Sequence, residues 1–472
     1  MTNITERIKK DTSNSPDIIT RNININNNKI YIIFSEVLCD GKYINDFILK
    51  RLTTLESNNL YNEILNNIPS NSITILEGYN DIITKIFQGF CVIIIDNKFI
   101  AIEAKANLDT GITQSENEIS IVGPNDSFNE NFNTNFGLIR KRIRSKNLVY
   151  KSIFIGKESN TKIGICYMKN IADDKLVNNI YQRIKNIDID GIIDTGYIRE
   201  ILLDKESIFP TVNVTERPDN ASTALLEGKI VIIVDNTPYV MIIPTFFIDF
   251  FHMPDDYYQK SFNITFIRII RLIAFIISIF LPAYYISVTT HNPESIPIKL
   301  LTNFASQRLG VPFPGFIEAL IMIICFEILR ESDARTPSKV GTSLSILGGL
   351  VLGEAAVEAG IVSPIMIIVI AISTISGLLF TTNTLMYTIR YFRIILLILS
   401  AFFGLYGIFI GMMFVIIKLS SIETFGYSYL TPFSPFIKTE LRDSIIKTRG
   451  KKLRLRNPVL AKKNIIRGHI HE

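Results

Sequence analysis

Three long apolar runs in the second half of the chain constrain its fold more than any other feature. The runs 272–290, 359–389 and 394–417 contain no Asp, Glu, Lys or Arg. Each is close to or longer than the roughly 20 residues that a helix needs to cross a hydrocarbon core about 30 Å thick. The composition agrees, since 47% hydrophobic residues and a mean hydropathy of +0.28 are high for a soluble enzyme. The sequence therefore predicts an integral membrane protein.

The first half of the chain has the pattern of a soluble α/β region. Charged residues interrupt its apolar runs, 30–37 and 93–104 have the pattern of strands, and 45–65 has that of a helix. The polar N-terminal segment lacks the apolar core of a secretory signal, so we expect this region on the cytoplasmic side. The predicted parts are a disordered polar tail (1–28), α/β subdomains at 29–148 and 149–258, an all-α transmembrane domain (259–420) and a basic cytoplasmic tail (421–472).

An internal similarity suggests that the two α/β subdomains are related. The segments GFCVIIIDNKFIAIEA from Gly89 and GKIVIIVDNTPYVMII from Gly228 align without a gap. In each, an apolar strand reaches an Asp-Asn pair, at 96–97 or 235–236, and a second strand follows. Asp and Asn tolerate the left-handed backbone of a tight turn, so both segments are predicted to be β-hairpins. A chance similarity between two apolar strands is the alternative.

Two segments beside the apolar runs are expected to contact membrane lipids. The aromatic and acidic segment 250–258 precedes the first run, and we predict an elbow there, with Arg268 and Arg271 near the headgroups. The tail 438–467 is crowded with Lys and Arg. A basic segment beside a membrane helix suits the anionic cytoplasmic leaflet.

The segment 347–363 carries two carboxylates, Glu354 and Glu358, among apolar neighbours. At about 100° per residue, one helix face carries both glutamates and the opposite face carries small residues. The small residues are Gly349, Gly353, Ala356 and Gly360. Glycines four residues apart let membrane helices approach closely, so this second face is predicted to pack. Two glutamates that face a soluble neighbour are the alternative.

Ionisable groups at membrane depth usually mark a pathway, and rings of Glu select cations. We therefore assign Glu354 and Glu358 to an ion pathway, with Val357 and Ile361 as a hydrophobic gate. Glu318 is added to this pathway, although a surface role fits the sequence equally well. It lies in the run 315–329, which is short for a straight span and suits a re-entrant or interfacial helix. The predicted topology is four spans plus this piece.

Two charged motifs flank the predicted hairpins and are assigned to contacts between domains or subunits. The assigned residues are Gly123, Pro124, Arg140 and Arg142 in the first motif and Glu216, Arg217, Pro218 and Asp219 in the second. A solvated helix face is the alternative for the basic cluster. Nucleic-acid binding fits poorly, because aromatic residues are not interleaved with the basic ones.

The sequence offers no catalytic constellation. It has no Gly-rich phosphate loop, its histidines are isolated, and no Ser or Cys lies in a nucleophile motif. The four cysteines are scattered without C-x-x-C spacing, which argues against zinc and disulfides. We expect no enzymatic activity, no metal and no cofactor.

At this point the chain resembles the A subunit of the GerA family of spore germinant receptors. The similarity is carried by GPNDSFNENFNTNFGLIRKRI, TERPDNASTALLEGKIVIIVDNTPYVMIIP, DDYYQKSFNITFIRIIRLIA, LGVPFPGFIEALIM, EILRESDARTP and GGLVLGEAAVEAGIVS. The resemblance implies a multi-pass protein of the inner membrane of a bacterial endospore. It also implies a transporter-like B subunit and a lipoprotein C subunit as partners, and self-association as a pentamer.

The resemblance implies a ligand-gated cation channel whose opening triggers germination. A helix with a small packing face and an acidic face fits this function on physical grounds alone. One alternative is a non-conducting receptor or scaffold subunit, in which the acidic helix is an interface. Another is a component of a secondary transporter, which would need an inverted repeat that the sequence does not display.

Overall fold

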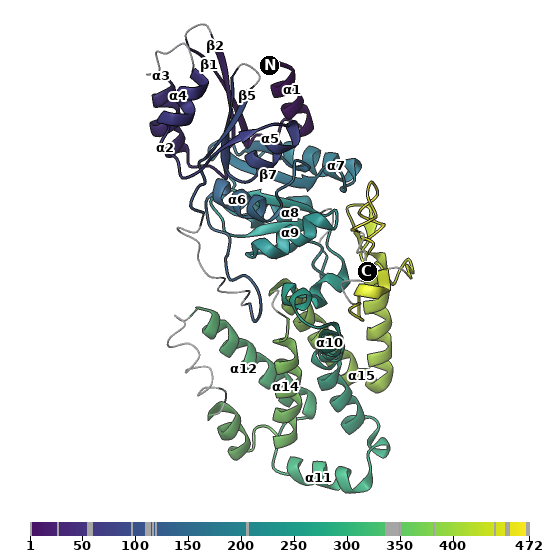
Figure 1. The fold of residues 1–472 in the computed structure, drawn as a ribbon. Coiled ribbons are helices and arrows are strands. Elements are labelled where there is room, and N and C mark those ends of the chain that lie inside the picture. Colours follow the sequence, from purple (N-terminus) through teal and green to yellow (C-terminus); the bar gives the residue numbers. More distant parts are fainter. Residues whose placement is uncertain are drawn as a thin grey trace.

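The computed structural model describes residues 2–25, 28–53, 60–95, 98–108, 115, 118, 120–203, 207–335, 349, 351–380, 383–438, 440–448 and 454–468. An α/β region and a helical bundle lie end to end (Figure 1). The α/β region contains two five-stranded sheets, and the bundle contains the apolar helices.

The first sheet is antiparallel, with the strand order β1-β2-β4-β5-β3. Successive residues of a strand point to opposite faces, and both faces of this sheet are covered. Ile32 and Ile93 face η1, α3 and α4, whereas Ile33 and Val92 face α1 and α5. The strands are β1 (Ile18–Ile25), β2 (Asn28–Ser35), β3 (Ile73–Leu76), β4 (Phe90–Ile95) and β5 (Lys98–Glu103). The helices are α1 (Thr2–Asp11), α2 (Gly41–Tyr43), η1 (Ile44–Leu49), α3 (Lys50–Thr53), α4 (Leu60–Asn67) and α5 (Tyr79–Ile86).

The prediction of a disordered tail at 1–28 is wrong, because α1 and β1 lie there. α1 packs Ile4 and Ile8 against the first sheet, and β1 pairs with β2 along its whole length. Both elements are rich in Asn and Thr, and α1 has only two apolar residues on its buried side. Such a sparse pattern of apolar residues gives only a weak helical periodicity in the sequence. Packing against the neighbouring sheet stabilises the helix.

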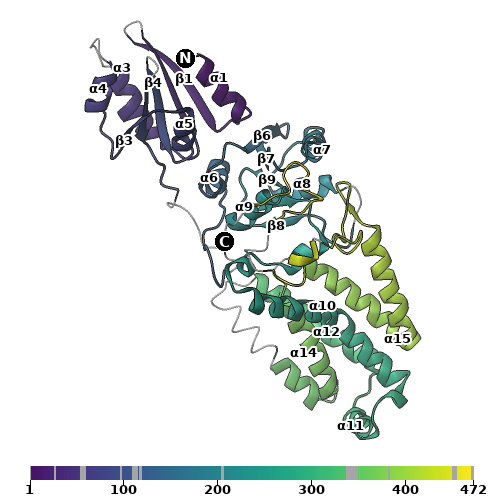
Figure 2. The same ribbon diagram turned by 45° about the vertical axis from the view of Figure 1, so that its right-hand side comes forward.

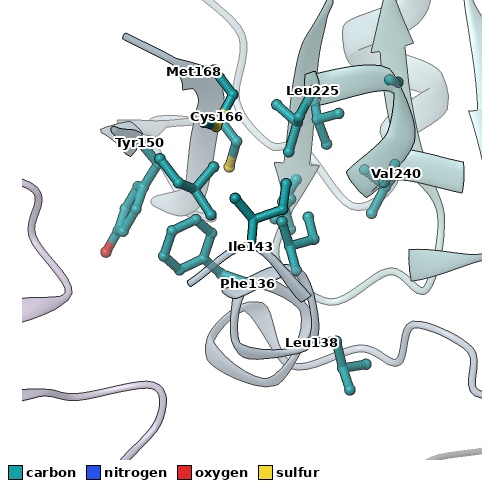
Figure 3. Close-up of a cluster of buried hydrophobic side chains, with 14 of the residues drawn as sticks. Phe136, Leu138, Ile143, Tyr150, Cys166, Met168, Leu225 and Val240 are labelled. Carbon is teal, nitrogen blue, oxygen red and sulfur yellow. The ribbon is translucent and has the colours of Figure 1, made fainter. Parts of the chain in front are cut away.

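The second sheet repeats the topology of the first, with the strand order β6-β7-β9-β10-β8. α6 and α9 cover one face, and α7 and α8 cover the other. Figure 3 shows Phe136 of α6, Cys166 of β7 and Leu225 of α9 converging in the first of these cores. The strands are β6 (Leu148–Ile155), β7 (Thr161–Met168), β8 (Asn213–Thr215), β9 (Ile230–Val234) and β10 (Val240–Ile243). The helices are α6 (Phe132–Arg142), α7 (Asp174–Lys185), α8 (Thr195–Leu202) and α9 (Pro218–Leu226).

The two aligned segments form β4–β5 and β9–β10, which occupy equivalent positions in the two sheets. Gly89 and Gly228 precede them with φ of 84° and 93°, a conformation that favours glycine. In the second turn Asn236 has φ of 69°, whereas residues 96–97 of the first turn lie outside the described residues.

The predicted boundary at 148/149 is wrong by one helix. α6 precedes it in sequence but packs on the second sheet.

Among the described residues, two helical segments are long and apolar enough to cross a membrane, Ser261–Thr290 and Thr384–Ser421, and the second contains a break at Gly404. The described bundle consists of α10 (Ser261–Thr290), α11 (Ile298–Arg308), α12 (Gly315–Arg335), α14 (Pro364–Gly377) and α15 (Asn383–Ser421). α10 lies at the centre and packs against α14 and α15. This agrees with the prediction of an α/β region followed by an apolar helical region.

α15 reverses its direction at Gly404, where φ is 58° and ψ is −138°. A Cβ on Gly411 would lie 2.2 Å from Leu396, so the residues after Gly404 run back along those before it. We call 383–403 the first arm of α15 and 405–421 the second arm. At this turn His291 Nε2 donates to the carbonyl of Ala401 at 2.8 Å. The run 394–417, predicted as one span, is therefore divided between two antiparallel arms.

α12 is a continuous helix of 21 residues and is longer than the short re-entrant or interfacial helix predicted at 315–329. Gly315 lies against Ile286 near the far end of α10, and Glu327 pairs with Arg390 of α15 at 3.0 Å. The helix continues through the charged residues up to Arg335, which makes it about 30 Å long at 1.5 Å per residue. The prediction ended the helix at 329, before Arg330. In the structure the same helix continues through the charged residues that follow.

A candidate coupling site between the α/β region and the bundle

An elbow at 247–258 joins the second sheet to α10. It consists of two short 3₁₀ helices, η2 (Phe247–Phe251) and η3 (Pro254–Tyr258). Phe247 and Phe251 contact Phe275 of α10 edge to face, with ring centroids 5.6 and 5.4 Å apart. In Figure 2, α10 begins beneath the second sheet and runs away from it. The elbow is therefore the covalent link between the two parts of the molecule, and it is packed against the first bundle helix.

Asp255 of the elbow binds the α/β region. Its Oδ1 accepts a hydrogen bond from Arg217 Nη1 at 2.9 Å, and its Oδ2 accepts from the backbone N–H of Ile121 at 2.8 Å. Arg217 also donates from Nη2 to Asp219 at 2.7 Å, and only 4% of its side chain is exposed. Burial alone would lower the pKa of Arg217, but the two carboxylates outweigh it and raise that pKa. The guanidinium is therefore charged and fully paired.

Asp256, the next residue, binds α10. Its two oxygens accept from Arg271 Nη1 at 2.8 Å and Nη2 at 2.9 Å, and Arg268 Nε donates to it at 3.2 Å. Asp256 is 1% exposed. Burial alone would raise the pKa of Asp256, but Arg271 and then Arg268 outweigh it and hold that pKa below its usual value. This is a buried, bidentate ion pair, the strongest kind of protein hydrogen bond.

The two carboxylates diverge because side chains one residue apart in a 3₁₀ helix point about 120° away from each other. Asp255 consequently holds the second subdomain, and Asp256 holds α10. Arg268 and Arg271, which were expected near the lipid headgroups, are both buried against the elbow. The sequence did contain a signal, namely two adjacent aspartates followed by arginines three residues apart on one helix face.

Residues near the C-terminus close over the elbow. Arg268 Nη1 donates to the carbonyl of Asp443 at 2.7 Å, and Lys447 Nζ donates to the carbonyls of Asp256 and Gln259. Burial and the charge of Arg268 lower the pKa of His252 to about 4. The ring is neutral at pH 7, and its Nε2 donates to the carbonyl of Ser444 at 2.6 Å.

A second link joins the end of α15 to the α/β region. The hairpin of β11 (Glu423–Thr424) and β12 (Tyr427–Ser428) follows the second arm, and Tyr427 donates to Asp173 at 3.2 Å. The described tail 454–468 then lies on the second subdomain. Its basic residues pair with carboxylates there: Lys462 with Asp173, Lys463 with Asp174 and Arg467 with Glu227. The expectation that the basic tail lies on anionic lipid is wrong for these residues.

Arg140, one of the predicted contact residues of the first motif, lies between the two subdomains. Arg140 donates to Asp17 at 2.9 Å, and both side chains are fully buried. The guanidinium is stacked between Phe87 and Phe136, 4.8 and 5.1 Å from the ring centroids. Asp17 joins α6 to the start of β1, a pairing that the sequence analysis did not identify.

The remaining predicted contact residues lie around Arg217. Arg142 pairs with Asp126 at 2.5 Å, and the carbonyl of Glu216 accepts from Ser127 Oγ at 3.0 Å. A Cβ on Gly123 would clash with the ring of Tyr258. Pro124 is exposed, whereas Pro218 is buried at the start of α9. Asp219 accepts from Tyr258 at 2.9 Å, which ties this motif to the elbow as well.

Of the predicted pore residues, Glu354, Val357 and Glu358 lie on a helix that covers 351–358, and both of these glutamates are exposed. A Cβ on Gly349 or Gly353 would meet no atom of the described residues within 4 Å, so these residues do not cover this part of the small-residue face. Ala356 packs against the bundle core, and Val357 is half-buried.

The helix ends before two of the residues assigned to its faces. Gly360 has φ of 65° and lies two residues after the last helical residue, Glu358, so it ends the helix and is not part of the packing face. Ile361 is 40% exposed in the turn that follows. Leu347, the first residue of this segment, lies outside the described residues.

Glu318 does not line water in the single chain. It is fully buried, and its Oε2 accepts from the backbone N–H and the hydroxyl of Ser363 at 2.9 and 2.8 Å. Ser363 is the N-cap residue of α14, where a carboxylate stabilises the positive end of the helix dipole. Arg308 lies 3.5 Å from the other oxygen. The contacts of Glu318 connect α12, α14 and α11.

Fold and site together define a class of protein in which a tandem α/β region is joined through buried ion pairs to an apolar helical bundle. The chain matches the family model described as Bacillus/Clostridium GerA spore germination protein over residues 6–459, and it belongs to this family. The resemblance seen in the sequence is thereby confirmed.

Relatives of known name agree with this membership. Spore germination protein KA of Bacillus subtilis (strain 168) is 35% identical over 93% of this chain and 82% of its own length. Spore germination protein GerQA of Bacillus cereus is 35% identical over 92% of this chain and 87% of its own. A crystal structure of the N-terminal domain of the A subunit of the Bacillus megaterium spore germinant receptor GerK3 matches 52% of this chain and 94% of that domain, with 30% identity and a TM-score of 0.39.

Proposed function

We propose that this chain is the A subunit of a nutrient germinant receptor in the inner membrane of a bacterial endospore, and that copies of it assemble into a ligand-gated cation channel. Family membership and the names of the relatives support the role in germination. In this proposal the subunit is a pentamer, has no enzymatic activity and acts with a transporter-like B subunit and a lipoprotein C subunit. The α/β region and the tail lie on the core side.

The uncovered acidic helix at 351–358 carries the channel part of the proposal. Within the described residues, neither Glu354 nor Glu358 has a hydrogen-bond or ion-pair partner, and Gly353 faces open space. The acidic face of this helix is exposed, whereas its small-residue face is open at Gly353 and packs against the bundle core at Ala356. Water would solvate the acidic face, and a neighbouring subunit would cover the open part of the small-residue face. In a ring of subunits, the carboxylates would then concentrate cations. Val357 and Ile361 would provide the hydrophobic constriction.

Replacing both Glu354 and Glu358 with glutamine is expected to reduce the K⁺ over Cl⁻ permeability ratio at least about tenfold. Each carboxylate attracts a cation 4 Å away by about 1 kcal/mol in water, and the two contributions add. The measurement is the reversal potential of the purified full chain in planar bilayers under a KCl gradient. The matched control replaces Glu6 and Glu158, two exposed glutamates of the α/β region, with glutamine. An unchanged ratio in the first variant would contradict the lumen assignment.

The same recordings separate the alternatives. A scaffold whose partner conducts would give no currents from the purified chain, whatever the state of the glutamates. A transporter component would give flux that saturates far below channel rates.

A further inference from the structure

A cavity of about 680 Å³ lies where the second arm of α15 meets the α/β region. This volume is typical of sites for small molecules, which measure roughly 300–1,000 Å³. Most of its walls are apolar, and they come from both parts of the molecule. The apolar lining residues are Leu202, Leu203, Ile208, Phe209, Phe392, Ile422 and Phe425. Such walls suit a hydrocarbon chain.

Two polar groups of the lining, Thr424 Oγ1 and the ammonium of Lys418, form no hydrogen bond or ion pair with the described residues, and the lining also contains the exposed carboxylate of Glu423. Thr424 is 2% exposed, and its Oγ1 forms no hydrogen bond with the described residues. A buried hydroxyl without a partner is costly, and a ligand that accepts a hydrogen bond would remove this cost. Lys418 lies in the last turn of the second arm. Its ammonium is 5.7 Å from the ring of Phe414, and no carboxylate of the described residues pairs with it.

The position of the cavity matches the boundary of a bilayer. Just before Lys418, the second arm presents Phe414, Ile416 and Ile417 with 43%, 49% and 60% of their surface exposed. After Lys418, the chain enters the hairpin that lies on the α/β region. An apolar band that ends in a lysine is typical of a membrane helix at headgroup level, where the ammonium reaches phosphate.

We propose that this cavity binds one acyl chain of an anionic phospholipid of the phosphatidylglycerol type. Lys418 contacts the phosphate, and Thr424 Oγ1 donates to an ester or headgroup oxygen. The bound lipid fills the junction between α8 and α15 and thereby fastens the α/β region to the bundle. The proposal rests on the membrane placement contained in the proposed function. One basic residue near an anionic surface contributes about 1 kcal/mol, so the preference over phosphatidylcholine is about fivefold.

A single introduced tryptophan measures occupancy, because the chain has none of its own. The Ile208→Trp indole reports from the cavity lining, and the Phe409→Trp indole reports from an exposed face of the second arm outside it. The full chain is reconstituted in phosphatidylcholine vesicles that contain a minor fraction of brominated phosphatidylglycerol or brominated phosphatidylcholine. At Ile208→Trp, the phosphatidylglycerol is expected to quench about fivefold more effectively. At Phe409→Trp, the two lipids are expected to quench equally.

Two further substitutions test the polar contacts. In the Ile208→Trp background, Lys418→Gln is expected to abolish the preference, and Thr424→Val is expected to weaken quenching by both lipids. Lys299→Gln, which removes an exposed lysine of α11 outside the cavity, is expected to leave the preference intact. Phe425→Trp serves as a second reporter in the lining, in case the indole at 208 itself fills the cavity.

The possible failures are distinguishable. Quenching at neither position would show that the bundle is not in the bilayer, and would overturn the proposed function together with the lipid site. Quenching at Phe409→Trp alone, with neither lining reporter affected, would overturn the lipid site and leave the membrane placement standing. Equal quenching by both lipids at the lining, unchanged by Lys418→Gln, would overturn the anionic specificity.

Discussion

Replacing Asp256 with asparagine is expected to destabilise the folded chain by about 3–5 kcal/mol, the cost of removing one partner from a buried ion pair. The substitution keeps the shape of the side chain but leaves Arg268 and Arg271 buried without their shared carboxylate. The loss should show as a lower midpoint of denaturant unfolding of the purified full chain in detergent. Because the same carboxylate orients the start of α10, we also expect germination driven by the variant receptor to fail.

The pH dependence of this variant provides an independent check. The pKa of Asp256 is lowered in the folded chain, so its stabilising effect is present above the usual pKa of about 4 and is lost as the pH falls below it. The difference in stability between the original chain and Asp256→Asn should therefore shrink in acid.

The matched control is Asp443→Asn, which removes the second carboxylate on Arg268. The side chain of Asp443 is 21% exposed, so the substitution should lower the free energy of unfolding by about 1 kcal/mol or less. Equal midpoints for Asp256→Asn and the original chain would contradict the coupling site.

Replacing Asp17 with asparagine is expected to cost a similar 3–5 kcal/mol, but at the junction of the two subdomains. Both oxygens of Asp17 accept from Arg140 Nη2, at 3.1 and 2.9 Å, and neither side chain is exposed. The stacking of Arg140 between Phe87 and Phe136 fixes the guanidinium in place, so it cannot swing into water when its partner is lost. Hydrogen exchange should then increase in β1 and α6 before it increases in the bundle.

The pair of Arg142 and Asp126 is the matched control for this second variant. Both side chains are 21% exposed, so Asp126→Asn should cost about 1 kcal/mol or less. If Asp17→Asn unfolded at the same denaturant concentration as Asp126→Asn, the buried pair would not hold the subdomains together.

The sequence predicted elements whose signal is local. The runs 272–290 and 394–417 lie in α10 and α15, whereas the run 359–389 is divided between α14 and the start of α15; the aligned segments form β4–β5 and β9–β10. The reversal at Gly404 escaped prediction because glycine is also frequent in uninterrupted membrane helices. By contrast, the end of the acidic helix at Gly360 had a readable signal, since a glycine just after the last periodic residue commonly ends a helix.

The coupling site was only partly predictable, because its charges find partners far away in sequence. Arg140 and Arg217 stood out as members of charged motifs, but their partners Asp17 and Asp255 could be identified only in the folded chain. The same reason explains the basic tail. A run of Lys and Arg suits lipid and protein carboxylates equally well, and the carboxylates of α7 lie where the tail returns.

The central claim is that the elbow couples the α/β region to α10 as one unit, and a double-mutant cycle on Arg217 and Arg271 tests it most directly. The two arginines bind adjacent carboxylates on opposite sides of the elbow, Arg217 through one hydrogen bond to Asp255 and Arg271 through a bidentate pair with Asp256. Arg→Lys at each position keeps the charge but removes the planar guanidinium that makes these contacts. The measurement is the free energy of unfolding of the full chain with each substitution alone and with both. We predict a coupling energy of about 0.5–3 kcal/mol, as in a shared network. Strict additivity of the two substitutions would contradict the claim.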